Sequence, residues 1–146
     1  FNRQGFMVTC DIFQGQPSDK TLYAATLKKY QQRLKGIPDY VVTDKGFRSG
    51  PNFKISRTIP YVCLGKLEDV QESQHAFCKS ARSATEGLIA VAKTLRGFGK
   101  SLYRGLQGDQ IWAGLCQAAY NLRKFLLLYR EEQLAEETLR KLGFIP

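Results

Sequence analysis

The stretch Tyr40-Val41-Val42-Thr43-Asp44 is a short apolar run that ends in an acidic residue. Its β-branched and aromatic residues, with no polar alternation, predict a buried strand that has Asp44 at its carboxyl end. Residues 5–13 are also rich in strand-forming residues and predict an earlier strand. Between the two, a helix capped by Ser18 is predicted, because apolar residues recur at intervals of four, three and four: Tyr23, Leu27, Tyr30 and Leu34. A strand, a crossover helix and a strand predict a right-handed parallel pair, and so a mixed α/β fold with helices packed on a sheet.

The remaining segments continue this α/β pattern. We predict, in chain order, a loop over 45–52, a short helix or turn over 52–57, a strand over 60–64, an acidic linker over 66–73, a helix over 74–95, a long helix capped by Asp109 and a short charged helix over 131–141.

Composition and length are those of a globular protein. The 146 residues fit one domain, and 43% hydrophobic with 24% charged residues is an ordinary soluble composition. We see no signal peptide, and the apolar run 125–128 is far too short to cross a membrane. The four cysteines lack zinc-ligand spacing, so we expect free thiols in a cytoplasmic protein that does not contact membranes.

The charge of the chain favours a polyanionic partner. The net charge is +9, and residues 78–104 hold six basic side chains but one acid, Glu86. Such an excess attracts phosphates through its field and through counterion release. From residue 131 onward the balance reverses, with four glutamates against Arg140 and Lys141.

Two acids stand out as candidate functional residues. Asp44 lies at a strand's carboxyl end, where α/β proteins form sites, although Asp also commonly caps a turn there. Glu86 is the only acid between Glu72 and Asp109, and Arg82 and Lys93 lie four residues before and seven after it, on one helix face. Glu86 is therefore either a surface ion-pair partner of Arg82 or a metal ligand between cations that contact phosphates.

The same residues carry a family resemblance. The Arg82, Glu86 and Lys93 pattern resembles the R-E-K signature around the last acid of the DDE transposases of bacterial insertion sequences. Residues 42–49, Val-Thr-Asp-Lys-Gly-Phe-Arg-Ser, resemble the second-aspartate motif of that family, and residues 14–19 resemble the turn before its first helix. Residues 103–106, with Trp112 and Asn121-Leu122, are similar to its C-terminal ending, so the resemblance covers nearly the whole chain.

This resemblance implies an RNase H-like mixed sheet flanked by helices, incomplete at the N-terminus and ending in helices. Residues 1–146 would be part of a catalytic domain whose first strands lie upstream. In such enzymes three carboxylates hold two Mg²⁺ (or Mn²⁺) ions for DNA strand cleavage and strand transfer. Asp44 and Glu86 would be two of these ligands, and Arg82 and Lys93 would position DNA phosphates. Weaker candidates for the same surface are Lys45, Arg48, Arg96, Lys100 and Arg104. The implied partners are transposon ends and target DNA, with a homo-oligomer of the full-length protein and a nucleoid location in bacteria.

Two departures from the family pattern shape the expectation of activity. Lys79 stands where a tyrosine is usual, and no residue matches the first catalytic aspartate. Asp11 is not assigned that role, because it lies mid-strand, where the family has no catalytic acid. We therefore expect this portion to be inactive alone.

Two other interpretations stay open: a non-enzymatic basic nucleic-acid-binding protein, and an inactive gene remnant. Catalysis requires the Asp44 and Glu86 carboxylates to lie within roughly 4 to 8 Å of each other, whereas simple binding does not.

Overall fold

The computed structural model describes residues 1–95 and 97–143. The chain divides into two compact units, one formed by Asp11–Val91 and the other by Phe1–Cys10 together with Ala92–Pro146. Helix α3 (His75–Leu95) contributes residues to both units.

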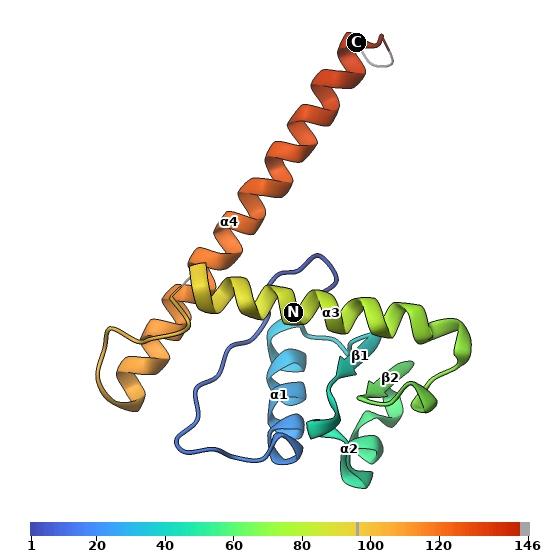
Figure 1. Cartoon of the computed structure of the whole chain (residues 1–146), viewed down its shortest axis with the longest axis vertical. Coiled ribbons are helices and arrows are strands. Elements are labelled where there is room, and N and C mark those ends of the chain that lie inside the picture. The colour runs from blue at the N-terminus through green and yellow to red at the C-terminus, as the bar shows by residue number, and fades with distance from the viewer. Residues whose placement is uncertain (96, 144–146) are drawn as a thin grey trace. The chain divides into compact units, whose positions relative to one another are not determined.

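The Asp11–Val91 unit is a mixed α/β structure, as predicted, and its sheet is small. Helix α1 (Asp19–Leu34) leads into strand β1 (Tyr40–Thr43), which pairs in parallel with β2 (Tyr61–Leu64), as Figure 1 shows. The register joins Tyr40 to Tyr61 and Thr43 to Leu64. Helix α2 (Gly50–Ile55) and the short 3-10 turn η2 (Ser56–Thr58) connect the two strands.

The core of this unit lies between α1 and the strands. Tyr23 and Leu27 of α1 are buried against Ile59 and Leu64, so the predicted helical stripe is confirmed in its first half, whereas Leu34 is exposed. Partly buried residues complete the cluster: Val41, Phe47, Phe53 and Val62. Strand β1 is half-buried along its length, not buried as predicted. The sheet of the described residues has two strands, so one edge of β1 has no strand neighbour.

The buried polar groups between α1 and α2 are paired. The Tyr23 hydroxyl bonds to Ser56 Oγ (2.5 Å), and Ser56 Oγ donates to the carbonyl oxygen of Asn52 (2.8 Å). Burial raises the pKa of the Tyr23 hydroxyl, and its bond to Ser56 acts in the opposite direction. These bonds offset the cost of removing the polar side chains from water.

The predicted strand over residues 5–13 is not formed, and the parallel pair is β1 with β2 instead. The polar backbone groups of Met7 bond to side chains of helix α4 (Gly105–Lys141) rather than to a neighbouring strand. The Met7 N–H donates to Asn121 Oδ1 (2.8 Å), and its carbonyl oxygen accepts from Gln117 Nε2 (2.7 Å) and Asn121 Nδ2 (2.9 Å). The side-chain amides of Gln117 and Asn121 thus bond to the Met7 backbone N–H and carbonyl oxygen, which a neighbouring strand would otherwise pair.

The predicted loop over 45–52 contains two helical pieces. The 3-10 turn η1 (Lys45–Phe47) follows β1, and α2 begins at Gly50. Ser49 Oγ accepts from Asn52 N (3.2 Å), and Pro51 lies in the first turn of α2. Serine and proline start helices as readily as they form loops, so the prediction of a loop throughout residues 45–52 was wrong. The acidic linker likewise contains the turns η3 (Leu67–Asp69) and η4 (Glu72–Gln74).

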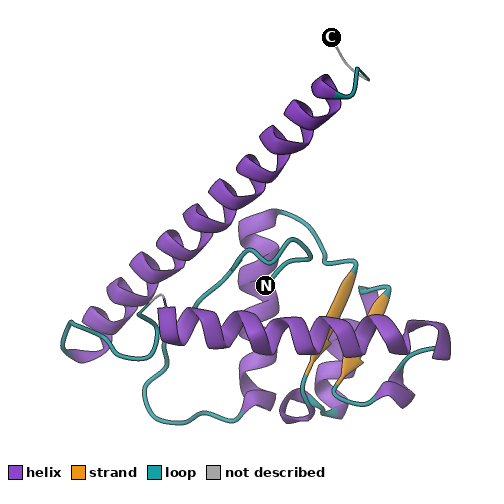
Figure 2. Cartoon of the chain, turned by 45° about the horizontal axis from the view of Figure 1, so that its top comes forward, coloured by secondary structure: helices purple, strands orange, loops and turns teal. Residues whose placement is uncertain are grey.

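The last two predicted helices are one helix. Helix α4 runs without interruption from Gly105 to Lys141, so Asp109 lies inside it rather than at its cap (Figure 2). No Gly or Pro occurs between Gly114 and the end of α4, so nothing in the sequence breaks the helix. The predicted division near Glu131 was wrong because a change of charge does not terminate a helix.

Trp112 joins α4 to the segment after α3. Its Nε1 donates to the carbonyl oxygen of Gly97 (2.9 Å), and its ring lies 6.0 Å from the ring of Tyr103. Gly97 has a positive φ of 77°, and a Cβ there would lie 3.1 Å from the Trp112 ring.

All four cysteines are free thiols, as predicted, and among the described residues no helix is both long and apolar enough to span a membrane.

We predict that Gly65→Ala destabilises the protein far more than Gly15→Ala. Both glycines have positive φ, but a Cβ at Gly65 would meet the backbone of Asp44 and Lys45, whereas a Cβ at Gly15 would meet nothing within 4 Å. Urea denaturation should show a loss of about 3–4 kcal/mol for Gly65→Ala, against roughly 1–2 kcal/mol for the strain alone at Gly15. Equal losses would show that the backbone contact at Gly65 does not constrain the fold.

Candidate functional site

Asp44 follows β1 directly, as predicted. It is the N-cap residue of η1, and its Oδ1 accepts from the backbone N–H of Gly46 (2.9 Å). The side chain is exposed, and Oδ2 makes no hydrogen bond within the described parts of the chain. Asp44 therefore caps a turn and also presents a carboxylate to solvent at the carboxyl end of the strand.

The carboxyl ends of the two strands meet at Gly65. This residue follows β2 with a positive φ of 87°, and a Cβ on it would lie 2.5 Å from the carbonyl carbon of Asp44. The backbones after β1 and β2 can approach this closely because residue 65 has no side chain. This contact fixes where the turn that carries Asp44 begins.

Asp19 lies beside Asp44, which sequence reasoning missed. A Cβ on Gly46 would clash with Asp19 Oδ2 and lie 3.1 Å from Asp44 Oδ1, so both carboxylates flank this glycine. Asp19 is the first residue of α1, the helix that leads into β1. Since such a helix runs antiparallel to the strand that follows it, its N-terminus reaches the carboxyl end of β1. This antiparallel arrangement of a helix and the strand after it could have predicted that Asp19 lies near Asp44.

Glu86 lies mid-way along α3, and its side chain is exposed. Because α3 is continuous, the steps of four and seven place Arg82 and Lys93 on its face, as predicted. In the part of the chain that the structure describes, Arg82 and Glu86 form no ion pair. A structural Arg82–Glu86 pair therefore does not account for this acid.

The first turn of α3 holds this helix on the sheet. The rings of Phe77 and Tyr40 meet edge to face with centroids 5.0 Å apart, at the start of β1. Cys78 is buried beside Cys63 of β2, and burial, followed by the Cys63 thiol, raises the pKa of the Cys78 thiol to about 11. The Cys78 thiol therefore stays protonated at neutral pH and serves as an apolar contact. From this anchor α3 runs across the strands rather than along them (Figures 1 and 2).

Among the described side chains, the hydrogen bond to the Asp44 carboxylate comes from the Gly46 N–H, and none joins Asp44 to Glu86. The predicted approach of the two carboxylates to within roughly 4 to 8 Å stays a prediction.

The donor chemistry of the two acids fits a hard divalent cation. Mg²⁺ and Mn²⁺ prefer carboxylate oxygens, and Asp44 and Glu86 are both exposed carboxylates. Over residues 1–95 and 97–143, no three His, Cys, Asp or Glu side chains are grouped closely enough to hold a metal ion.

Arg48 is held by an acid of the chain itself. Its Nη2 and Nε donate to the two carboxylate oxygens of Asp69 (2.6 and 3.3 Å), and its guanidinium lies over the Phe53 ring. The hydrogen bond to Asp69 is the main cause that raises the pKa of Arg48. Sequence reasoning assigned Arg48 to the DNA surface and missed Asp69.

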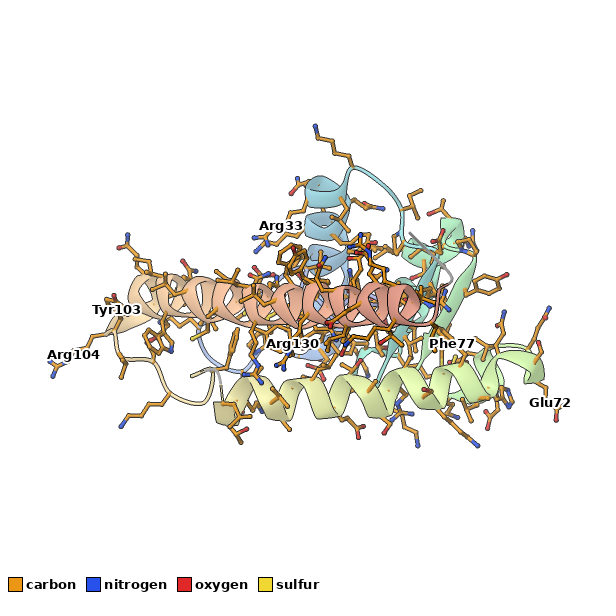
Figure 3. The ribbon with its side chains drawn as sticks, turned by 90° about the horizontal axis from the view of Figure 1, so that it is seen from above. Arg33, Glu72, Phe77, Tyr103, Arg104 and Arg130 are labelled. Carbon is orange, nitrogen blue, oxygen red and sulfur yellow. The ribbon has the colours of Figure 1, made fainter. Side chains whose placement is uncertain are left out.

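The other candidate cations differ in how they are presented. Lys45, Lys93 and Lys100 are exposed. Arg104, just before α4, points away from the ribbon in Figure 3. Arg96 lies outside the described residues.

Asp11 and His75 have structural partners. Asp11 forms an ion pair with Lys29 of α1. His75 is the first residue of α3, and its Nε2 donates to the carbonyl oxygen of Val70 (3.3 Å).

Comparison with known proteins identifies the family. A family model described as the transposase DDE domain matches residues 1–122, which include Asp44, Arg82, Glu86 and Lys93. The match spans parts of both compact units and ends within α4. No curated protein and no solved structure matches the chain. Since the matched residues make up most of the sequence, the chain belongs to the DDE transposase domain family.

Proposed function

We propose that this chain carries two of the three catalytic carboxylates of a metal-dependent transposase that cleaves DNA and transfers the strand. Family membership supports a role in transposition and DNA as the substrate. The observation that carries the finer proposal is Asp44, an exposed carboxylate at the joined carboxyl ends of two parallel strands.

The proposed roles follow from the chemistry of each side chain. Asp44 and Glu86 supply carboxylate oxygens. When bound there, Mg²⁺ or Mn²⁺ supplies charge neutralisation at the phosphate and activation of the attacking water or 3′-hydroxyl. Arg82 and Lys93 flank Glu86 on one face of α3 and contact DNA phosphates, which orients the strand without reading its sequence.

The third carboxylate comes from outside residues 1–146 in this proposal. Asp11, the candidate nearest the turn before α1, is already paired with Lys29, which supports leaving it out of the ligand set. The non-enzymatic alternative keeps DNA binding but assigns no catalytic role to Asp44 or Glu86, so carboxylate variants distinguish the two functions.

We predict that Asp44→Asn and Glu86→Gln each reduce DNA cleavage by the intact transposase about 1000-fold or more. Asn at position 44 can still accept from the Gly46 N–H, so the cap is kept while the charge is lost. Cleavage of labelled transposon ends is the measurement, and Glu72→Gln, another exposed acid, is the control. Full cleavage by both variants would show that neither carboxylate is catalytic, whereas DNA binding without any metal-dependent cleavage by the unsubstituted transposase would support the non-enzymatic alternative.

We predict that Arg82→Ala combined with Lys93→Ala flattens the salt dependence of DNA binding. Loss of two phosphate contacts should reduce the slope of log K against log salt by about 1.8. Lys20→Ala with Lys28→Ala removes the same charge from α1 and is the matched control. An equal change in both double variants would mean that net charge, and not the face of α3, determines the slope.

We predict that the 146-residue chain alone does not cleave DNA in Mg²⁺ or Mn²⁺, because it supplies two of the three carboxylates. Cleavage should return when the upstream residues of the gene are added. The proposed source of the third ligand is wrong if the chain alone cleaves DNA and both Asp44→Ala and Asp11→Ala abolish that activity.

A further inference from the structure

Arg48 joins the segments that follow the two strands. It lies directly after η1, the turn behind β1, whereas Asp69 ends η3, the turn behind β2. Two parallel N–H to oxygen bonds, of 2.6 and 3.3 Å, connect them. A bidentate guanidinium–carboxylate pair fixes orientation as well as distance, which a lysine in the same place does not.

Both members of the pair are held from outside it. The Asp69 side chain is only 7% exposed, so it has little freedom to turn away. On the other side, the Arg48 guanidinium lies 5.4 Å from the centre of the Phe53 ring in α2. The guanidinium is thus confined between a carboxylate after β2 and an aromatic ring in the connection between the strands, with two directions of movement restricted.

A short series of contacts leads from Arg48 back to Asp44. The Arg48 N–H donates to the carbonyl oxygen of Lys45 (3.1 Å), which closes the η1 turn. Inside that turn, the Gly46 N–H donates to Asp44 Oδ1. At its start, Gly65 meets the backbone of Asp44 and Lys45. The orientation of the Asp44 carboxylate therefore depends on a turn whose far end is held by Arg48.

We propose that Arg48 is a positioning residue that, through Asp69, sets the orientation of the Asp44 carboxylate, and is not a DNA contact. This inference rests on the proposed function in that it takes Asp44 as a catalytic carboxylate. It differs from the prediction that Arg48 is part of the phosphate-binding surface, because the Asp69 carboxylate engages two of the five guanidinium N–H donors and offsets the positive charge that would attract a phosphate.

The test measures amide hydrogen exchange in the 146-residue chain by NMR. Arg48→Ala and Asp69→Asn should each speed exchange of the Gly46 amide about tenfold, and Arg48→Lys should give an intermediate value. Amides in the middle of α1 report any change in the stability of the unit, and they should change far less. The same variants should leave the salt slope of DNA binding unchanged.

A second measurement uses the intact transposase. Arg48→Ala should lower kcat for DNA cleavage about tenfold and leave KM for DNA unchanged, and Asp69→Asn should match it.

Several results would overturn the proposal. A salt slope reduced by about 0.9 in Arg48→Ala, with Gly46 exchange unaffected in Asp69→Asn, would make Arg48 a phosphate contact. Equally faster amide exchange in α1 and at Gly46 would show that the Arg48–Asp69 pair only stabilises the unit as a whole. Full DNA cleavage by Asp44→Asn would contradict the proposed function. The rate of Gly46 amide exchange would still decide whether Arg48 orders the turn.

Discussion

The backbone contact between Gly65 and the Asp44–Lys45 peptide is the constraint on which the Asp11–Val91 unit depends. The parallel pair has only four paired residues on each strand, so ladder bonds alone define its geometry weakly. Leu64, the last residue of β2, is fully buried, and Gly65 then turns the chain with a positive φ against the neighbouring strand end. With the two ends joined, the turns η1 and η3 are brought near each other, and Arg48 can bond to Asp69.

The elements that could be predicted from the sequence are those set by local periodicity. The stripe of α1 and the apolar runs of β1 and β2 need no knowledge of distant residues, and their observed bounds agree closely with the predicted ones. The strand over residues 5–13 failed because a strand requires a partner, and the composition of a segment does not say what will bond to its backbone. At Met7 the partners are side-chain amides more than a hundred residues away, at 117 and 121. Loops failed for a different reason, because Ser, Gly and Pro both begin helices and interrupt them.

At the candidate site, too, the residues placed by the adjacent sequence could be predicted, and those placed by contacts between distant segments could not. Asp44 was predictable because its place follows from the strand before it. The proximity of Asp19 and Asp69 to the site was not predicted, since each meets the site through pairing of segments that lie 25 residues from Asp44 on either side along the chain. The Asp69 partner of Arg48 could not be predicted, because a basic residue beside a candidate acid looks the same in sequence whether it binds phosphate or a carboxylate of the chain. A salt bridge with a partner 21 residues away has no signature in local spacing.

The cap at η1 does not by itself explain why residue 44 is an aspartate. Capping uses one acceptor oxygen, and Asn or Ser provides that acceptor as well as Asp does. The negative charge of Asp44 and its second oxygen have no use within the turn. Glu86 presents a parallel case, because a charged side chain in the middle of α3 gains nothing from a cap and has no ion-pair partner within the described residues. In both places the local structure accounts for the backbone and leaves an exposed carboxylate oxygen, and such a group in a strongly basic chain is suited to a cation that bridges protein and phosphate.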